Sequence, residues 1–140
     1  MTSNADHSRF EFKSEGPRGA IKKVVEYQYV GSNIFNLAFG DWDEEMQKMK
    51  DHVRSNNLDR DKVLTTVAFT AIDFMKYHPD TIICLQGNTP AKTRLYRMGI
   101  NSNLSVISRL FSIGGYVDDV WESFNKQKNY DGFTLTAKNN

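Results

Sequence analysis

The sequence predicts an α+β domain with a mixed, largely antiparallel sheet that is covered by helices. Three observations carry this prediction: β-branched and aromatic residues form short runs between turn residues, two segments have helical periodicity, and several connections have hairpin length. A doubly wound sheet would need stricter alternation of strand and helix. The expected order is three or four strands, a helix, a strand, a helix and two strands.

The N-terminal part is expected to form consecutive strands. We expect residues 1–8 to be disordered, because they are polar and lack apolar anchors. Strands are predicted at residues 10–12, 21–30 and 34–39, each followed by turn-forming residues. Residues 45–54 fit either a short helix or a strand, and we favour the strand.

The clearest helix is predicted from Arg60 or Asp61 to Tyr77. Its apolar residues recur at the three-and-four spacing of one buried face. Asp59 or Asp61 can cap its start, and Pro79 stops it. The residues expected to face the sheet include Val63, Val67, Ile72 and Phe74.

A central strand and a second helix are expected to follow. Residues 81–85 form a short apolar run that is typical of a buried strand. Thr89 is the expected N-cap of the second helix, Pro90 its first residue and Gly99 its end. The rest of the chain is expected to add a helical turn or two and two strands, at residues 106–111, 114–117 and 132–136.

Composition places the chain among ordinary globular proteins. It has 140 residues, 39% of them hydrophobic, and 18 Lys and Arg against 17 Asp and Glu. We therefore expect one domain, over residues 9–140, and regard nucleic acid as an unlikely partner.

The chain has no apolar run of membrane-spanning length and no signal-peptide core, so a cytoplasmic protein with no membrane partner is expected.

Cysteine and histidine offer little chemistry. The single Cys84 lies in the apolar run of the central strand, where we expect it to be buried and inert. The histidines, which are His7, His52 and His78, lack the spacing of a metal site, so no metal is expected.

The strongest functional motif is the junction between the central strand and the second helix. It combines a glycine turn with a capped helix start and three cationic side chains, which favours a site for phosphate or carboxylate. A well-capped helix with a solvated basic face is the alternative. The candidate ligand-binding residues are Gly87, Asn88, Thr89, Lys92, Arg94 and Arg97.

Two further clusters contain candidate functional residues. Asn56, Asn57, Arg60 and Lys62 surround the start of the first helix and are candidate ligand-binding residues; the alternative is a simple turn. If the two preceding strands are neighbours, both helix starts would share one sheet edge.

The acidic cluster at residues 41–45 contains two weak candidates for a general base, Asp41 and Glu44, although a solvated hairpin turn is the commoner outcome.

Two motifs resemble a family of small bacterial proteins of unknown function. They are Ser-Asn-Asn-x-Asp-x-x-Lys-Val-Leu-x-Thr-Val at residues 55–67 and Gly-Asn-Thr-Pro-Ala-Lys-Thr-Arg-Leu-Tyr at residues 87–96. The resemblance extends from Phe10 to Leu135. The resemblance implies that the chain is related to this family, for which no activity is established.

The chain also resembles the catalytic core of the GNAT N-acyltransferases. The expected element order is close to that fold, and the second helix carries Asn88, Ala91, Leu95-Tyr96 and Gly99-Ile100 in a similar arrangement. The resemblance implies acyl-CoA as cofactor, Tyr96 as the general acid for the departing thiolate, and a pyrophosphate facing residues 56–62. The family's pyrophosphate-loop motif is absent.

The leading functional hypothesis is a GNAT-like domain that binds an anionic ligand, either acyl-CoA or a nucleotide-like phosphate, with N-acyl transfer as its potential reaction. The alternative is a catalytically silent module that binds a protein partner, such as one half of a toxin–antitoxin-like or defence pair. The sequence does not decide whether the chain is an enzyme.

Overall fold

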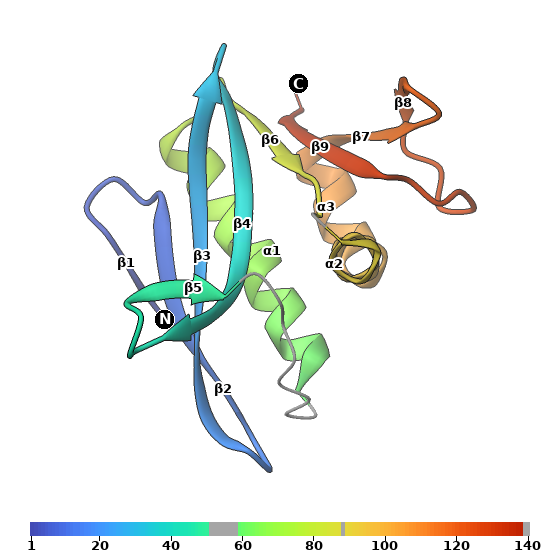
Figure 1. Cartoon of the computed structure of the whole chain (residues 1–140). Coiled ribbons are helices and arrows are strands. Elements are labelled where there is room, and N and C mark those ends of the chain that lie inside the picture. The colour runs from blue at the N-terminus through green and yellow to red at the C-terminus, as the bar shows by residue number, and fades with distance from the viewer. Residues whose placement is uncertain (51–58, 88, 139–140) are drawn as a thin grey trace.

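The architecture is a single mixed sheet with helices, as predicted. A computed structural model describes residues 1–50, 59–87 and 89–138 (Figure 1). Within these ranges it contains a largely antiparallel sheet of nine strands, together with three helices. None of the helices in these ranges is both long and apolar enough to cross a membrane.

Five strands form the N-terminal part of the sheet. They are β1 (Thr2–Ser3), β2 (Arg9–Gly16), β3 (Gly19–Gly31), β4 (Ile34–Asp43) and β5 (Lys48–Lys50). The three strands predicted first correspond to β2, β3 and β4. β5 lies within the ambiguous segment 45–54, whose residues 51–54 are outside the described ranges.

The segment expected to be disordered has contacts in the structure. Thr2 and Ser3 pair with β2 as β1. The imidazole of His7 stacks on the Tyr77 ring, with the ring centroids 3.7 Å apart. The structure thus places residues 1–8 against the sheet and the C-terminal end of the first helix.

Three helices and four strands complete the fold. They are α1 (Arg60–Tyr77), β6 (Ile82–Leu85), α2 (Pro90–Ser102), α3 (Leu104–Leu110), β7 (Phe111–Val117), β8 (Val120–Ser123) and β9 (Gly132–Ala137). The strand order is β1-β2-β3-β4-β6-β9-β7-β8, and β5 pairs with β4 outside this path. The pair β4–β6 is parallel, whereas all the other strand pairs of the described residues are antiparallel.

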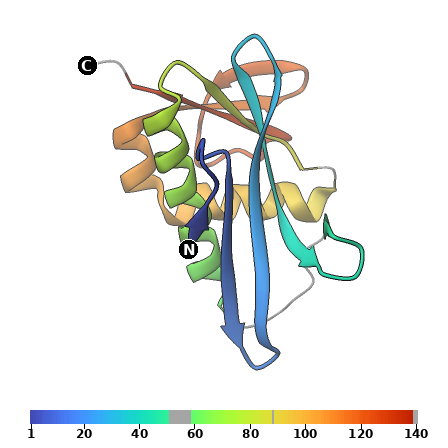
Figure 2. The same cartoon turned by 90° about the vertical axis from the view of Figure 1, so that its left-hand side faces the viewer.

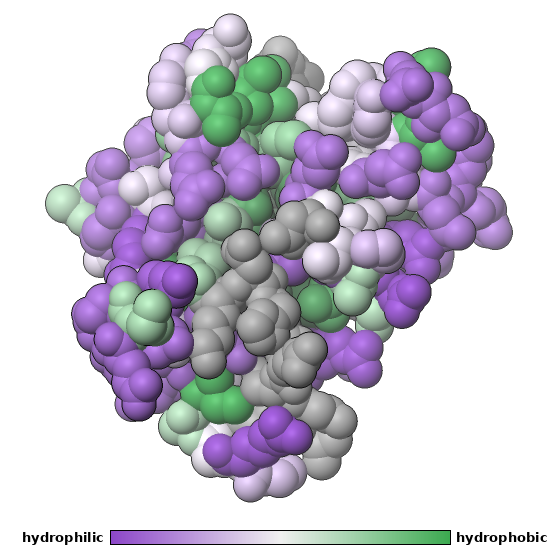
Figure 3. Space-filling view, viewed as in Figure 1, coloured by the Kyte–Doolittle hydropathy of each residue, from purple (hydrophilic) through white to green (hydrophobic). Residues whose placement is uncertain are grey.

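α1 and α3 lie behind the sheet, and α2 runs between its two halves. Figure 1 shows α1 behind β3 and β4, and α3 behind β7 and β9. The same view looks almost along the axis of α2, and Figure 2 shows that helix from the side, running from its start towards α1 and α3. The start of α2 is therefore turned towards the open face of the sheet. Hydrophilic residues cover most of the described surface on that face (Figure 3).

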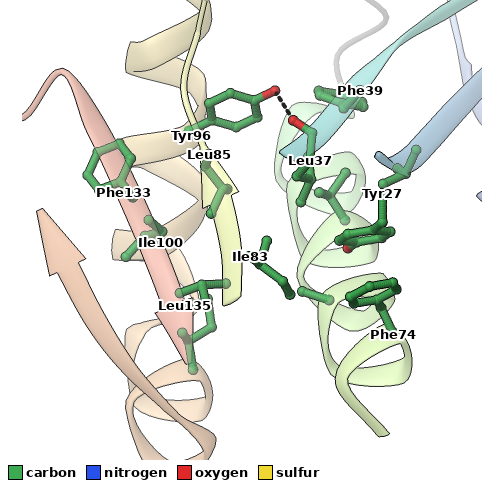
Figure 4. Packing of buried hydrophobic residues seen from close by; sticks show 14 of the residues in the cluster. Tyr27, Leu37, Phe39, Phe74, Ile83, Leu85, Tyr96, Ile100, Phe133 and Leu135 are labelled. Carbon is green, nitrogen blue, oxygen red and sulfur yellow. Dashed lines mark hydrogen bonds between the residues drawn. The ribbon is translucent and has the colours of Figure 1, made fainter. Parts of the chain in front are cut away.

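The core lies between α1 and the sheet. Phe74 of α1 is fully buried and stacks on Tyr27 of β3, with the ring centroids 4.3 Å apart. Val63 and Val67 are buried on the same helix face, as predicted, and Ile72 is partly buried. Figure 4 shows this face meeting apolar side chains from both halves of the sheet.

Several predicted boundaries were wrong. α2 continues to Ser102, past Gly99, because Asn103 closes the helix by donating its side-chain amide to the Gly99 carbonyl at 2.9 Å. Phe111 begins β7 and does not end a helix. The strand β8 was not predicted; it follows a turn in which Asp118 and Asp119 both have positive φ. With β1, α3 and β8 added, the element order is longer than the GNAT-like order that was expected.

The start of α1 is held in a way that the sequence did not indicate. Asp59 occupies the N-cap position but makes no capping hydrogen bond with its side chain. Its carboxylate instead accepts hydrogen bonds from the Ser14 hydroxyl at 2.7 Å and from the Glu15 backbone N–H at 3.1 Å. Asp59 therefore ties the beginning of α1 to β2.

A charge on the buried face of α1 should prevent folding. Val67 is 7% exposed and Phe69, two residues later, is 54% exposed. We expect Val67→Asp to cost more than about 3 kcal/mol, because it buries a carboxylate without a partner. Phe69→Asp is the matched control, with an expected cost of about 1 kcal/mol or less. Thermal unfolding followed by circular dichroism measures both, and a cooperative wild-type-like transition for Val67→Asp would contradict this packing.

Candidate functional site

A gap in strand pairing marks the edge of β4. β6 pairs with β4 only at Ile34, Phe35 and Asn36, and β5 pairs with it only from Asp41 onward. On this edge, the residues from Leu37 to Gly40 therefore have no partner strand among the described residues. Unpaired edges expose backbone hydrogen-bonding groups, which must be satisfied in another way.

Two side chains of α2 reach this gap. The Tyr96 hydroxyl donates to the Leu37 carbonyl at 3.3 Å (Figure 4), and the Lys92 ammonium group donates to the Phe39 carbonyl. Both side chains are buried, and the Lys92 nitrogen lies 5.4 Å from the centre of the Phe39 ring. α2 thus takes the place of a partner strand along this part of β4.

The first cleft beside α2 is called the β4 cleft here. It has a volume of about 550 Å³ and lies along the gap in β4. Its lining combines cationic, carboxamide and aromatic side chains from β2, β3, β4, the β5 hairpin and α2. They include Arg9, Gln28, Asn36, Trp42, Lys48 and Lys92.

The second cleft, here the α2 cleft, has a volume of about 460 Å³ and lies at the start of α2. It brings together Gly87, Thr89, Arg94 and Arg97, four of the residues predicted to bind an anion. The loop before β9 adds Asn129 and Asp131, and Gln86 lines both clefts. The junction of strand and helix that was predicted from sequence is therefore a concave surface.

The backbone donors at the start of α2 are largely used within the helix itself. Thr89 is the N-cap, as predicted, and its hydroxyl accepts from the Lys92 N–H at 3.1 Å. The Thr89 carbonyl accepts from the Thr93 N–H, and Pro90 has no N–H. An anion in the α2 cleft would consequently depend on side-chain donors more than on the helix terminus.

The guanidinium groups of Arg94 and Arg97 are the available side-chain donors. Arg94 is exposed and makes no hydrogen bond or ion pair with the described residues. Arg97 is partly buried and donates to the side-chain oxygen of Asn129. Neither is paired with a carboxylate in the described part of the chain, although the exposed Asp131 lines the same cleft.

The predicted residues at the start of α1 lie elsewhere. Arg60 contacts Met98 of α2, with 3.7 Å between its Nη1 and the sulfur, and Lys62 lines a third cleft with Phe12 and Phe69. Neither lines the β4 cleft or the α2 cleft. Three other predicted residues, Asn56, Asn57 and Asn88, are outside the described ranges.

The acidic candidates have different surroundings. Asp41 is 16% exposed and pairs with the ammonium group of Lys23, which is almost fully buried. Glu44 is 70% exposed in the hairpin between β4 and β5, with its carboxylate 3.9 Å from the Lys22 nitrogen. Neither carboxylate lines the two clefts beside α2, and a role as general base stays a prediction.

Gly87 is required by close packing. A Cβ at this position would lie 2.4 Å from the Thr93 backbone nitrogen and 2.9 Å from the Lys92 carbonyl carbon. The loop after β6 therefore runs directly against the first turn of α2. This contact fixes the wall of the α2 cleft.

The environment of Cys84 differs from the one expected. The thiol is partly exposed, whereas the sequence predicted burial. The burial that remains raises its pKa, because a thiolate loses solvation more than a thiol does. Within the part of the chain that the structure describes, desolvation is the cause of this shift, and it is opposite to the lowered pKa of a reactive cysteine.

Some lining residues were missed by the sequence analysis. Asn36 lies within a predicted strand, Gln86 was not among the candidate residues, and Asn129 and Asp131 lie more than thirty residues from Arg97. Gln86 could have been found, because it directly precedes the glycine turn. The others depend on which strands are neighbours in the sheet.

The chain belongs to a family of unknown function, DUF6934, whose model matches residues 1–138. Neither the curated proteins nor the solved structures contain a match. The function must therefore be argued from the site.

The two glycines near the ends of α2 should respond oppositely to alanine. Gly87→Ala should destabilise the fold by roughly 1–3 kcal/mol, because its Cβ meets backbone atoms of the first turn. Gly99→Ala is the matched control: its Cβ would meet Leu64 at an ordinary 3.5 Å, and alanine stabilises a helix interior by about 1 kcal/mol. Chemical denaturation measures both. Equal effects would mean that the loop after β6 does not pack as described.

Cys84 should be a slow thiol in the native protein. Because its pKa is raised, less thiolate is present at a given pH than in the unfolded chain, whose thiol has a pKa of about 8.5. Labelling with a disulfide reagent should therefore be slower in the native state, and its rate should rise at higher pH than in denaturant. Native labelling as fast as in denaturant would show that Cys84 is more reactive than this environment allows.

Proposed function

We propose that this chain is a ligand-binding domain that holds a small phosphate-bearing anion in the α2 cleft. The observation that carries the proposal is the pair of guanidinium groups of Arg94 and Arg97, which line one cleft without a carboxylate partner in the described residues. Arginine binds phosphate oxygens through two parallel hydrogen bonds. Arg97 is oriented by Asn129, which reduces the conformational entropy lost on binding.

The local packing favours a preformed site. Gly87 allows the loop to lie against the first turn of α2, and the Thr89 cap fixes the helix start. Both arginines extend from the same helix, one turn apart. The proposed ligand would meet an arranged surface on rigid elements, as preorganised binding sites require.

Binding is proposed without catalysis. Acyl-CoA carries the phosphate groups that such a cleft recognises, so it is one member of the ligand class. The Tyr96 hydroxyl, however, donates to the Leu37 carbonyl, and its side chain lines a small apolar cavity of about 30 Å³ in the core. A role of Tyr96 as general acid stays a prediction.

Removing the two guanidinium groups should abolish anion binding. We expect wild type to bind pyrophosphate or coenzyme A in a calorimetric titration, with weaker binding at higher salt. Each of Arg94→Ala and Arg97→Ala should lose roughly 1–3 kcal/mol of binding free energy, as for a charge-assisted hydrogen bond. Folding stability should change little for the exposed Arg94.

Arg109→Ala is the matched control, because Arg109 is an exposed arginine on α3 whose Nε donates to the carbonyl of Ser105 in its own helix. This variant should bind like wild type. Equal loss in all three variants would indicate nonspecific charge attraction. If wild type binds none of phosphate, pyrophosphate, coenzyme A and acetyl-CoA, the proposal fails, and the protein-interaction module remains as the alternative.

A further inference from the structure

We propose that the β4 cleft binds the base of a nucleotide, so that the anion in the α2 cleft is the phosphate of that nucleotide. This inference rests on the proposed function for its anionic part. Its base-binding part rests on separate residues, which can be tested without phosphate.

The described lining of the β4 cleft contains as many carboxamide side chains as charged ones. Four carboxamides line it, namely Gln28, Asn36, Gln47 and Gln86. The side chains of Asn36 and Gln86 make no hydrogen bond with the described residues. A carboxamide presents a donor and an acceptor in one plane, which matches the paired donors and acceptors on the edge of a base.

The cleft also offers flat surfaces. Trp42 is partly buried, and the guanidinium carbon of Arg9 lies 5.2 Å from the centre of its ring. The Lys22 nitrogen lies 5.4 Å from the same ring, and both cations contact one oxygen of Glu11, so they lie on the same side of the indole. Bases stack on aromatic rings and on guanidinium planes. Arg9 and Trp42 both line the cleft, so either can serve as the stacking platform.

The charges of the β4 cleft are largely matched within the protein. Arg9 pairs with Glu11 and Glu26, and the Lys92 ammonium group donates to the Phe39 carbonyl. Lys48 is exposed and makes no ion pair with the described part of the chain. A neutral group such as a base therefore fits this cleft, and the phosphate of the same ligand would lie in the α2 cleft.

The two clefts meet at one residue. Gln86 lines both of them and lies in the loop between β6 and α2. A base in the β4 cleft and a phosphate beside Arg94 would therefore be on opposite sides of the same short loop. The near-neutral chain, with its net charge of +1, suits a single nucleotide better than a polyanion.

Tryptophan fluorescence provides a direct test. The chain has two tryptophans, Trp42 in the β4 cleft and Trp121 on β8. In the Trp121→Phe protein, Trp42 is the single reporter. We expect at least one of AMP, GMP, CMP and UMP to change its emission, and the matching nucleoside to do so more weakly. Pyrophosphate should bind in calorimetry without a comparable change in emission.

Variants of the lining separate the two clefts. Asn36→Ala should weaken binding of the nucleotide and its nucleoside by about tenfold, the scale of one lost two-point contact with a base, and should leave pyrophosphate affinity unchanged. Gln28→Ala, at an exposed position on β3, gives a second variant if Asn36→Ala unfolds. Gln127→Ala removes an exposed carboxamide outside both clefts and should have no effect.

The outcomes distinguish this inference from the proposed function. If pyrophosphate binds through Arg94 and Arg97 but no nucleotide or nucleoside alters Trp42 emission, the base site is overturned and the anion site stands. If nucleosides bind and pyrophosphate does not, the proposed anion site fails and the base site remains. If glucose or ribose binds as strongly as the nucleosides and is equally weakened by Asn36→Ala, the cleft binds saccharides and the inference is wrong.

Discussion

The backbone carbonyl groups of Leu37 and Phe39 help to join the two halves of the sheet where the pairing of strands between these halves is short. β3 and β4 are joined by eight aligned residue pairs, whereas β4 and β6 share only three. Where that parallel pairing ends, the side chains of Tyr96 and Lys92 supply the hydrogen bonds that a strand would have made. The two halves of the sheet are therefore joined partly by a helix.

This arrangement constrains the placement of α2. To reach the edge of β4, the helix must enter between the two halves of the sheet, so its start faces the open side (Figure 2). Burying the Lys92 ammonium group carries a desolvation cost, which the Phe39 carbonyl and ring partly offset. The same side chain then borders the β4 cleft, so a group that closes the sheet also shapes the site.

The elements that were predictable are those specified by local sequence. The apolar spacing of α1, the Thr89-Pro90 start of α2 and the strand runs between turns all depend on near neighbours, and the structure confirms them. The boundary at Gly99 was wrong because glycine here lies in a helix interior beside Leu64, and Asn103 provides the cap. Asp59 was expected to act locally, but its carboxylate bonds to Ser14, 45 residues away.

The site was predictable to the extent that it is one segment of chain. Arg94 and Arg97 are three residues apart on α2, and Gly87 and Thr89 directly precede that helix, so local geometry brings the four residues into one cleft. Lys92 belongs to the same turn but points to β4, and no pattern in the sequence distinguishes a lysine that meets a strand carbonyl from one that meets solvent. Its direction follows from the gap between β5 and β6, which is a property of strand register. Because that gap also creates the β4 cleft, the residues that line it could be found only after the order of the strands was known.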